Sequence, residues 1–369
     1  MAMYTEADSS DLSETQIGLP LGLRLDLDDV PRAVLNMRAL RAFDLAPARY
    51  PIHRVVSCVA RGQTVQLFDD LAMRSGFAAQ RLGTGSLFLE GPGVLAILKG
   101  SPKTHYTSCR FTFWTDTPER AVATEALLLE IVGERRMREE TFTIDWRFGT
   151  GDGSLTGVSF EELVDPALLD EAYPALNEPV LAFIERYLAA PETILIVQGP
   201  PGTGKTRLVR AVLGALSRRT SGRSSVLYTA DRRALESDQI FIEFLTEEHD
   251  AFVVEDADHI LTSRANGNLD MHRFLAIADG IVRAQGRKIL FTTNLPNVGD
   301  IDEALLRPGR CFANVRTRAL SQSEAASLVR RICGGEDGLF ERAMGRVRRN
   351  GASSMTLAAI YQCLPPDLR

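Results

Sequence analysis

Apolar runs that end in glycine, polar or acidic residues recur through the second half of the chain and indicate buried strands. Such runs begin at Ile194, Ser225, Ala251 and Lys288. A segment with helical spacing of apolar residues, 207–213, follows directly after the first run and its loop, and another is expected near 237–245. Buried strands that alternate with helices predict an α/β fold, a parallel sheet with helices on both faces.

The part of the chain before this sheet has another pattern, short β-rich segments separated by Gly and Pro. Strands are expected at 54–60, 64–68, 86–90, 94–99, 105–114 and 141–148. Thr117-Pro118-Glu119 marks the start of a helix, because a cap residue, a proline and an acid suit its first turn. Alternating leucines at 19–27 suggest one more strand, and Pro31 opens a helix through Phe43. Together these predict an N-terminal α+β recognition domain over 19–148.

Several boundaries are expected from composition. Residues 1–18 are polar and acidic without apolar periodicity, which predicts a flexible acidic tail. The glycine-rich stretch 149–157 predicts a linker. Helical patterns at 160–169 and 177–188 then lead into the α/β core, 158–320. Ser321 and Glu324 form a capping box that opens a small C-terminal helical lid, 321–369.

Charge and cysteine content exclude some classes of protein. The formal net charge of −6 argues against a protein whose whole surface tracks nucleic acid, but it does not exclude a local basic groove. The five cysteines are scattered and odd in number, so neither a disulfide framework nor a zinc site is indicated. No signal peptide or membrane-spanning apolar run is found, and we expect a cytoplasmic protein without a membrane partner. His53 and His105 have no partners at metal-ligand spacing and are interpreted as structural.

The loop after the strand at Ile194 carries the strongest chemical signal in the chain. It matches G-x-x-x-x-G-K-[ST] between a buried strand and a helix, and its residues are Gly199, Pro200, Pro201, Gly202, Thr203, Gly204, Lys205 and Thr206, followed by Arg207. Glycines allow backbone N–H groups to surround phosphate, and the positive end of the helix faces the anion. Lys205 is expected to reach the β- and γ-phosphates and Thr206 to bind Mg²⁺. The sequence therefore predicts binding of ATP with Mg²⁺.

Acidic and amide residues follow two further strands. Glu255 and Asp256 come directly after the apolar run at Ala251, where one carboxylate can hold Mg²⁺ and its neighbour can polarise an attacking water. Asn294 ends the strand at Lys288 and can reach the γ-phosphate or that water. Arg307 and Arg310 lie on a later turn, and a guanidinium there can neutralise charge on the transferred phosphoryl group.

These motifs, in this order, resemble the AAA ATPases over about Val158 to the C-terminus. The loop 199–206, the acids at 255–256, Asn294 and the turn 301–310 correspond to Walker A, Walker B, sensor 1 and the second region of homology. The Glu-Asp order and the sequence Phe291-Thr292-Thr293-Asn294 look most like the Bcs1-type subgroup. The membrane segment of that subgroup is absent from this sequence, so its mitochondrial role is not carried over.

The resemblance implies a role for each matching residue. Glu255 would take the metal-side role with Thr206, Asp256 would activate water, Asn294 would act as the sensor, and Arg307 and Arg310 would be arginine fingers. Because such arginines usually complete the site of an adjacent subunit, the resemblance implies a homo-oligomeric ring, expected to be a hexamer. Asp256 is one methylene shorter than the usual base, which predicts slow hydrolysis.

The resemblance favours ATP-driven remodelling or translocation of a protein partner bound by the N-terminal domain. Two other functions remain open: a nucleic-acid-directed ATPase, and a nucleotide-gated scaffold that scarcely turns ATP over. The loop that grips substrate in the family aligns with Asp231-Arg232-Arg233 and has no aromatic residue at its tip. These arginines are expected either to contact acidic peptide or phosphate in a pore or to form a solvated pair.

Overall fold

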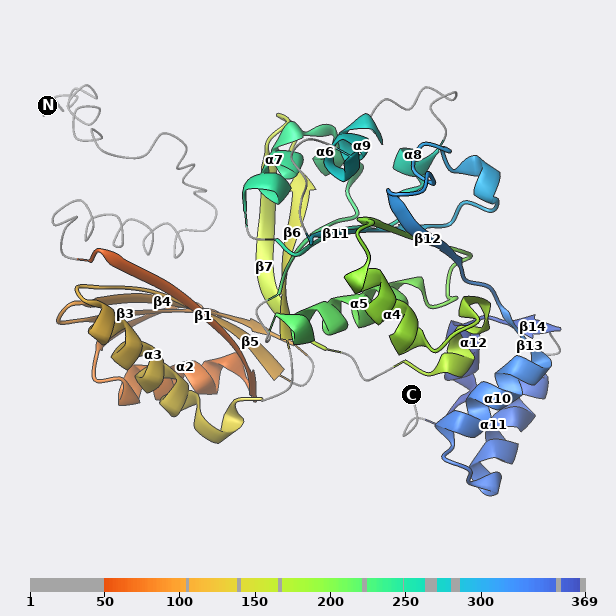
Figure 1. The fold of residues 1–369 in the computed structure, drawn as a ribbon. Helices are drawn as coiled ribbons and strands as arrows, with labels where there is room; N and C mark the ends of the chain where they lie inside the picture. Colours follow the sequence, from red (N-terminus) through yellow and green to blue (C-terminus); the bar gives the residue numbers. More distant parts are fainter. Residues whose placement is uncertain are drawn as a thin grey trace, which may run out of the picture. The chain divides into compact units, whose positions relative to one another are not determined.

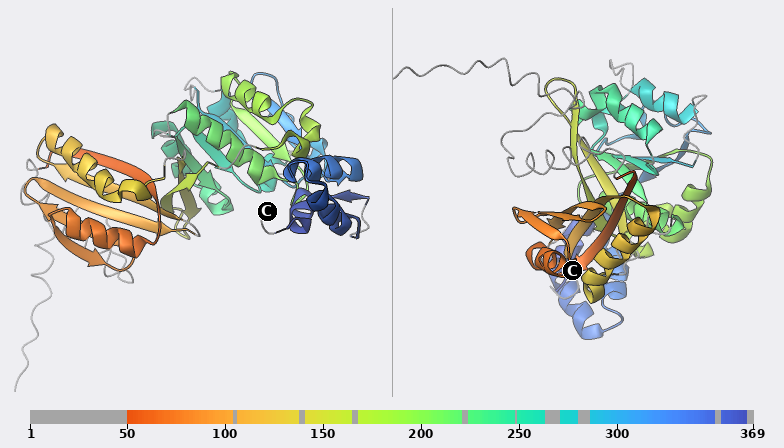
Figure 2. Two further views of the ribbon diagram at one scale, coloured as in Figure 1. Left: turned by 90° about the horizontal axis from the view of Figure 1, so that it is seen from below. Right: turned by 90° about the vertical axis from the view of Figure 1, so that its left-hand side faces the viewer.

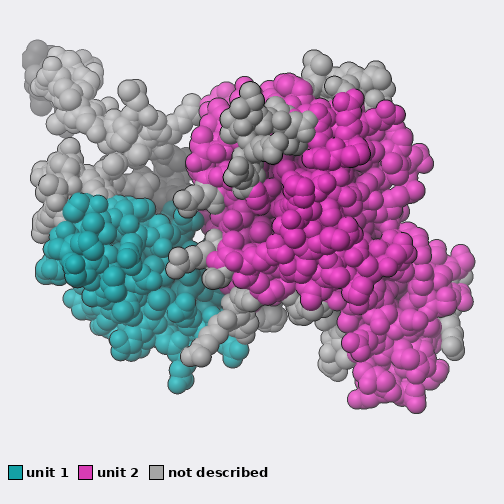
Figure 3. Space-filling view, viewed as in Figure 1, with its two compact units in different colours: residues 1–138 teal, residues 139–369 magenta. Residues whose placement is uncertain are grey.

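The computed structural model describes residues 50–103, 106–137, 141–164, 168–220, 224–247, 249–262, 271–279, 286–349 and 353–365. The chain divides into two compact units, 1–138 and 139–369, which are distinguished in Figure 3. The predicted tail at 1–18, the strand at 19–27, the helix at 31–43 and His105 lie outside the described residues.

In its described residues, the first unit consists of an antiparallel sheet packed with the helices α2 and α3 (Figure 1). The sheet order is β1-β5-β4-β3-β2. Its strands and helices are β1 (Ile52–Arg61), α2 (Thr64–Arg74), β2 (Ala78–Leu82), β3 (Ser86–Gly91), β4 (Val94–Pro102), β5 (Tyr106–Thr115), α3 (Pro118–Val132) and the short η4 (Gly133–Arg135). Thr117 caps α3, since its hydroxyl accepts a hydrogen bond from Arg120 N. The core joins α2 and α3 to one face of the sheet through Leu71, Phe111 and Leu128.

One strand prediction in this unit is wrong. The segment 64–68 is not a strand but the first part of α2, and Thr64, Leu67, Phe68 and Leu71 are its buried residues. Those positions recur with the period of a helix and form one apolar stripe. The β-branched and aromatic residues of this short run satisfy a strand pattern as well, and packing against the sheet decides between the two.

The second unit is built on a seven-stranded sheet of order β12-β8-β11-β10-β9-β6-β7. Its strands are β6 (Thr141–Gly149), β7 (Leu155–Leu163), β8 (Ile194–Gln198), β9 (Ser225–Thr229), β10 (Ala251–Val254), β11 (Lys288–Thr293) and β12 (Cys311–Arg316). Neighbouring strands from β12 to β6 are parallel, and β7 is antiparallel to β6. Helices cover both faces of this sheet (Figures 1 and 2), which confirms the predicted α/β class.

Alternating residues of the central strands enter two different cores. Leu195 and Val253 pack with helices that include α4 (Val180–Ala189) and α5 (Lys205–Arg219). Ile196 and Phe252 pack on the other face. The helices of that face are the short α6 (Arg232–Glu236), α7 (Asp238–Thr246), α8 (Asp258–Leu261) and α9 (Met271–Asp279). Burial on both faces explains why these strands read as continuous apolar runs.

Two predictions at the start of this unit are wrong. The glycine-rich stretch predicted as a linker at 149–157 contains the end of β6, a hairpin turn and the start of β7. In the turn, the Thr150 hydroxyl bonds to Asp152 and Ser154. The segment 160–169 is not a helix at its start, because β7 continues through Leu163. β6 pairs with β9, so the predicted domain edge at residue 148 shifts to between Arg138 and Glu139. Glycine, aspartate and serine suit a hairpin turn as well as a linker.

The chain ends in a helical subdomain below the sheet in Figure 1. Its elements are β13 (Leu320–Ser321), α10 (Gln322–Ile332), α11 (Asp337–Arg349), β14 (Ser354–Met355) and α12 (Leu357–Cys363). The predicted capping box is present: Ser321 accepts from Glu324 N, and the Glu324 carboxylate accepts from Ser321 N at 2.8 Å. The short η5 (Asp170–Ala172), η6 (Pro174–Leu176) and η8 (Val298–Asp300) complete the regular elements.

Candidate nucleotide-binding site

The loop between β8 and α5 has the backbone geometry that its glycines predict. Gly202 and Gly204 have φ of 76° and 91°, a left-handed conformation that other residues rarely adopt. A Cβ at Gly204 would lie 2.6 Å from Leu357 Cδ1 and 2.8 Å from the Tyr173 hydroxyl. Gly204 is therefore required both by conformation and by the closeness of its neighbours.

A cavity of about 540 Å³ opens beside this loop. The predicted residues Pro201, Gly202, Gly204, Lys205, Thr206 and Arg207 line one side. Glu255, Asp256 and Asn294 line a second side, and Leu357, Ala358 and Tyr361 of α12 line a third. The parallel strands β8, β10 and β11 all end here, which is where open α/β sheets place their ligands.

The other predicted loop residues shape the loop rather than line the cavity. Gly199 N donates to Thr293 O at 3.0 Å, which joins the loop to the end of β11. The buried Thr203 hydroxyl donates to Pro200 O at 2.7 Å and lies 2.7 Å from the Thr317 hydroxyl. These contacts hold the loop in one conformation.

Lys205 is the first residue of α5, and its ammonium lies at the centre of the site. Nζ donates to Gly199 O at 2.8 Å, to Pro200 O at 3.2 Å and to Asn294 Oδ1 at 2.8 Å. Burial lowers the pKa of Lys205, while the nearby carboxylates of Asp256, Asp258 and Glu255 act in the opposite direction. A cation held this way is directed toward the cavity, where phosphate oxygens can replace the carbonyl partners.

Glu255 is fixed by two hydroxyl groups. The Thr206 hydroxyl donates to Glu255 Oε1 at 2.7 Å, and the Tyr228 hydroxyl donates to Oε2 at 2.7 Å. Burial and the hydrogen bond to Glu255 both raise the pKa of Tyr228, so its phenol stays protonated and remains a donor. Thr206 and Glu255 present adjacent oxygen ligands, the donor type that Mg²⁺ prefers, so these residues fit that ion.

Asp256 and Asn294 form the neighbouring pair. Asn294 Nδ2 donates to Asp256 Oδ1 at 3.0 Å, while its Oδ1 accepts from Lys205. Asp256 has φ of 49°, a left-handed conformation that Asp tolerates better than most residues. Asp258 fixes the backbone behind the pair, since its Oδ1 accepts from Asn294 N at 2.8 Å and from the Thr293 hydroxyl at 2.5 Å.

The two predicted arginines do not join this cluster within one chain. Neither Arg307 nor Arg310 is among the residues that line the cavity. Arg307 is exposed, and Arg310 is half-buried with Nη1 donating to Ala304 O at 2.8 Å. Exposure of Arg307 leaves its guanidinium accessible to another molecule, whereas Arg310 also supports its own turn.

The sequence reasoning missed three residues at the site. Tyr228 is the next-to-last residue of β9, which pairs with β10, the strand directly before Glu255. Its place near the end of an apolar run is the signal in the sequence, of the same kind as for Glu255 and Asn294. Arg207 was predicted, but its partner Tyr361 was not: the guanidinium lies 4.4 Å from the ring centroid. Tyr173, whose hydroxyl donates to Gly204 O at 2.9 Å, has no local signal.

Replacing Tyr228 with phenylalanine is expected to raise the Mg²⁺ concentration needed for half-maximal ATP hydrolysis by roughly 10-fold, because loss of an outer partner loosens a metal-binding carboxylate. Binding of ATP without Mg²⁺ should stay unchanged. A Mg²⁺ titration of the ATPase beside magnesium-free ATP binding measures both. Tyr361→Phe keeps the ring over Arg207 and is the matched control. An unchanged Mg²⁺ requirement in Tyr228→Phe would remove Tyr228 as a positioning residue.

A parallel sheet, a glycine loop that opens a helix, and acids at the end of a neighbouring strand define a P-loop nucleotide-binding domain. Comparison with known proteins narrows this class, since residues 195–318 match the ATPase family associated with various cellular activities, AAA. Residues 195–318 therefore form an AAA domain.

Several curated proteins are similar to part of this chain. ATP-dependent zinc metalloprotease FtsH of Acidothermus cellulolyticus is 34% identical over 165 residues, 40% of this chain and 24% of the relative. The ATP-dependent zinc metalloprotease YME1 homolog of Caenorhabditis elegans is 30% identical over 41% of this chain and 20% of its own length. An AAA ATPase forming ring-shaped complexes, from Bifidobacterium adolescentis, is 26% identical over 40% of this chain and 32% of its own length. The chain thus spans a third or less of each of these relatives.

None of the five histidines of this chain is followed by glutamate, as the H-E-x-x-H zinc motif of metalloproteases requires. Among the helices of the described residues, none combines the length and apolar character needed to cross a membrane.

Proposed function

We propose that this protein hydrolyses ATP with Mg²⁺ as a homo-oligomeric ring and uses the energy to remodel or translocate a protein partner recognised by the first unit. The observation that carries the proposal is the contact set in one cavity: Lys205 beside Asn294, Asn294 beside Asp256, and Glu255 beside Thr206. The FtsH and YME1 relatives, named as ATP-dependent proteases, support action on proteins.

The residues of the cavity divide the chemistry among them. Lys205 and the backbone N–H groups of the loop bind the phosphates. Mg²⁺, held by Thr206 and Glu255, would neutralise charge on the phosphate oxygens. Asp256 accepts a proton from the attacking water, and Asn294 orients both Asp256 and the γ-phosphate. The apolar face of α12 and the Arg207–Tyr361 pair bound the remaining side of the cavity, where the base of the nucleotide fits.

Ring assembly rests on Arg307. This side chain is exposed and lies outside the cavity of its own chain, so it can act only in the site of a neighbour. The Bifidobacterium adolescentis relative is named for forming ring-shaped complexes, which supports a ring here, and we expect six subunits. The Bcs1-type assignment and a pore position for Arg232 and Arg233 are further parts of this proposal. Arg232 Nε lies 3.2 Å from Glu236, four residues on.

Replacing Arg307 with alanine is expected to lower kcat on the order of a thousandfold, because an arginine finger stabilises charge in the transition state. ATP binding should persist. Steady-state hydrolysis of the assembled protein measures the effect, with the exposed Arg331 of α10 replaced by alanine as the control.

Mixing two inactive variants tests the ring directly. Arg307→Ala keeps its own cavity, and Lys205→Met keeps its arginine, so a mixed ring contains complete sites where the two meet. We expect the mixture to regain hydrolysis that neither variant has alone. No gain on mixing, in particles shown to contain both variants, would contradict a shared site.

A slow nucleotide-gated scaffold is the second candidate function, and the short side chain of Asp256 favours it. A displacement of about 1 Å of a catalytic group can cost on the order of a hundredfold in rate. Single-turnover hydrolysis separates the two: a motor completes chemistry in seconds, whereas a scaffold holds ATP uncleaved over many minutes.

A further inference from the structure

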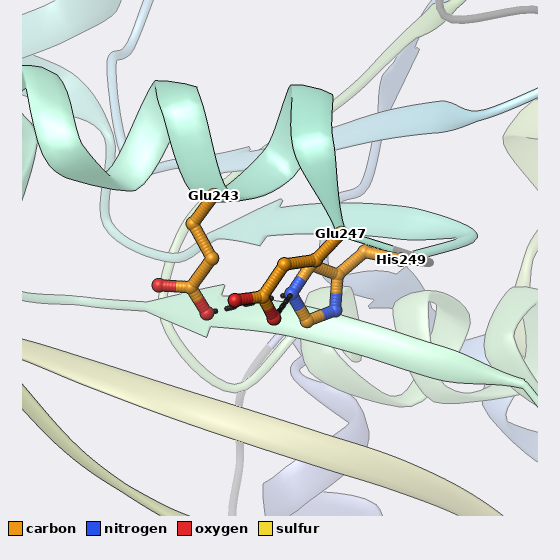
Figure 4. Close-up of side chains that lie close together, drawn as sticks. All are labelled: Glu243, Glu247 and His249. Carbon is orange, nitrogen blue, oxygen red and sulfur yellow. Dashed lines mark ion pairs between the residues drawn. The ribbon is translucent and has the colours of Figure 1, made fainter.

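A second group of polar side chains lies at the other end of the α/β sheet from the ATP site. Glu243 and Glu247 come from the last turn of α7 and its C-terminal cap, and His249 precedes β10. Their side chains converge in Figure 4, and one potential ligand atom from each lies within 4.8 Å of the others. The ATPase chemistry proposed above uses none of them.

The imidazole of His249 is buried and held in one orientation. Its ring is 3% exposed, and Nδ1 lies 2.9 Å from the Ser225 hydroxyl. That hydroxyl donates to Asp145 Oδ2 at 3.0 Å, because a carboxylate only accepts. Ser225 Oγ must then accept from Nδ1–H, and in the neutral imidazole this leaves the lone pair on Nε2.

The lone pair of Nε2 faces two negatively charged groups. Nε2 lies 3.4 Å from Glu243 Oε1 and 3.5 Å from Glu247 Oε2, and this buried atom has no hydrogen-bond partner among the described residues. A nitrogen lone pair that faces two carboxylates is repelled by both. The arrangement is stable only with a positive charge between these three atoms.

The distances fit a metal ion. Zinc binds nitrogen and oxygen ligands at about 2.0–2.1 Å with tetrahedral geometry, which separates the ligand atoms by roughly 3.3–3.4 Å. The two Nε2–carboxylate distances are close to that value. A histidine whose second nitrogen is fixed by an outer hydrogen bond, as Ser225 and Asp145 do here, is the usual arrangement around such an ion.

The local charge also favours a dication. The carboxylates of Asp145, Glu243 and Glu247 surround His249, and Arg147 supplies the one positive charge among these groups. Arg147 Nε donates to both oxygens of Glu243, at 2.9 and 3.0 Å, and so fixes that carboxylate. Three negative charges against one positive leave two to be neutralised.

We propose that Glu243, Glu247 and His249 bind a divalent transition-metal ion, with zinc the best match to one imidazole and two carboxylates. The side chain of Glu247 is 60% exposed, so the ion enters from solvent and a water completes its coordination. The ion joins the end of α7 to the start of β10 and, through His249 and Ser225, to β9. Its role is structural and is separate from hydrolysis.

Zinc binding to the full-length protein tests the site. Metal-free protein is titrated with Zn²⁺ against a chromophoric chelator, and Co²⁺ is used as a spectroscopic substitute whose visible absorption reports coordination by nitrogen and oxygen. We expect one tight site per chain. Glu247→Gln, an exposed change that leaves packing intact, should weaken zinc binding on the order of a hundredfold, and His249→Gln at least as much.

Matched controls are Glu336→Gln in the lid and His272→Gln on α9, both exposed, which should bind zinc like the wild type. ATP binding should be equal in all five proteins, and a variant that does not fold would be recognised by its loss of ATP binding. Wild-type binding no tighter than that of Glu247→Gln would overturn the proposal. A second result would also overturn it: His249 is protonated at neutral pH in chelator-treated protein, and added zinc does not displace that proton. The proton, and not a metal ion, would then supply the positive charge.

Discussion

Replacing Lys205 with methionine is expected to weaken ATP binding by roughly ten- to a hundredfold, because charged hydrogen bonds contribute about 1.5–3 kcal/mol. The ammonium donates to Gly199 O, Pro200 O and Asn294 Oδ1, so all the groups that converge on it lose their shared donor. Methionine keeps the length of the side chain and removes its charge. Isothermal titration with ATP and a non-hydrolysable analogue measures the loss.

Lys99→Met is the control for this experiment. Lys99 is exposed on β4 of the first unit, and its replacement removes the same charge from a residue that does not line the cavity. ATP affinity of Lys99→Met should equal that of the wild type. Wild-type affinity in Lys205→Met, with an unchanged melting temperature, would show that the nucleotide binds elsewhere.

Replacing Asp256 with asparagine is expected to lower kcat by about a hundredfold or more while ATP binding is retained, because a general base contributes roughly 10²–10⁴ to the rate. Asparagine is isosteric, tolerates the left-handed conformation at this position, and keeps an oxygen to accept from Asn294 Nδ2. The loss should therefore appear in the chemical step, which single-turnover hydrolysis measures.

Asp258→Asn is the control that distinguishes loss of the general base from loss of a nearby negative charge. Asp258 lies next to the same amide but points its carboxylate at Asn294 N and the Thr293 hydroxyl. We expect it to alter stability more than kcat. Equal and appreciable turnover in Asp256→Asn and wild type would exclude Asp256 from the mechanism. The ATP-bound Asp256→Asn form also offers a stable state in which to capture and identify the protein partner.

The parts of the site that the sequence predicts are those whose spacing is local. The residues from Gly199 to Thr206 lie in one loop, and strand, loop and helix agree with each other, so the loop could be read directly. Glu255 and Asn294 were accessible because each ends an apolar run, and parallel strands end at one edge of a sheet. These predictions needed no knowledge of which strands pair.

The parts that the sequence left out depend on pairing between distant segments. β6 adds to β9 across more than one intervening helix, and nothing in residues 141–148 indicates which sheet they enter. The hairpin turn at Gly151 has the composition of a linker, so the sequence predicts the domain boundary about ten residues after its position in the structure. Tyr361 and Tyr173 reach the site from segments on either side of the motif, and packing alone brings them there. The contact between His249 and Ser225 likewise joins residues that are far apart in the sequence.

The lid and the phosphate loop are in direct contact, and this has a mechanical consequence. Ala358 N donates to Gly202 O at 3.0 Å, and Gly204 is too close to Leu357 for any side chain. Because no space separates the loop from the start of α12, even a small shift of the loop changes these contacts. We therefore expect the start of α12 to move with the loop when phosphate leaves, and this movement would turn α10 and α11 relative to the sheet.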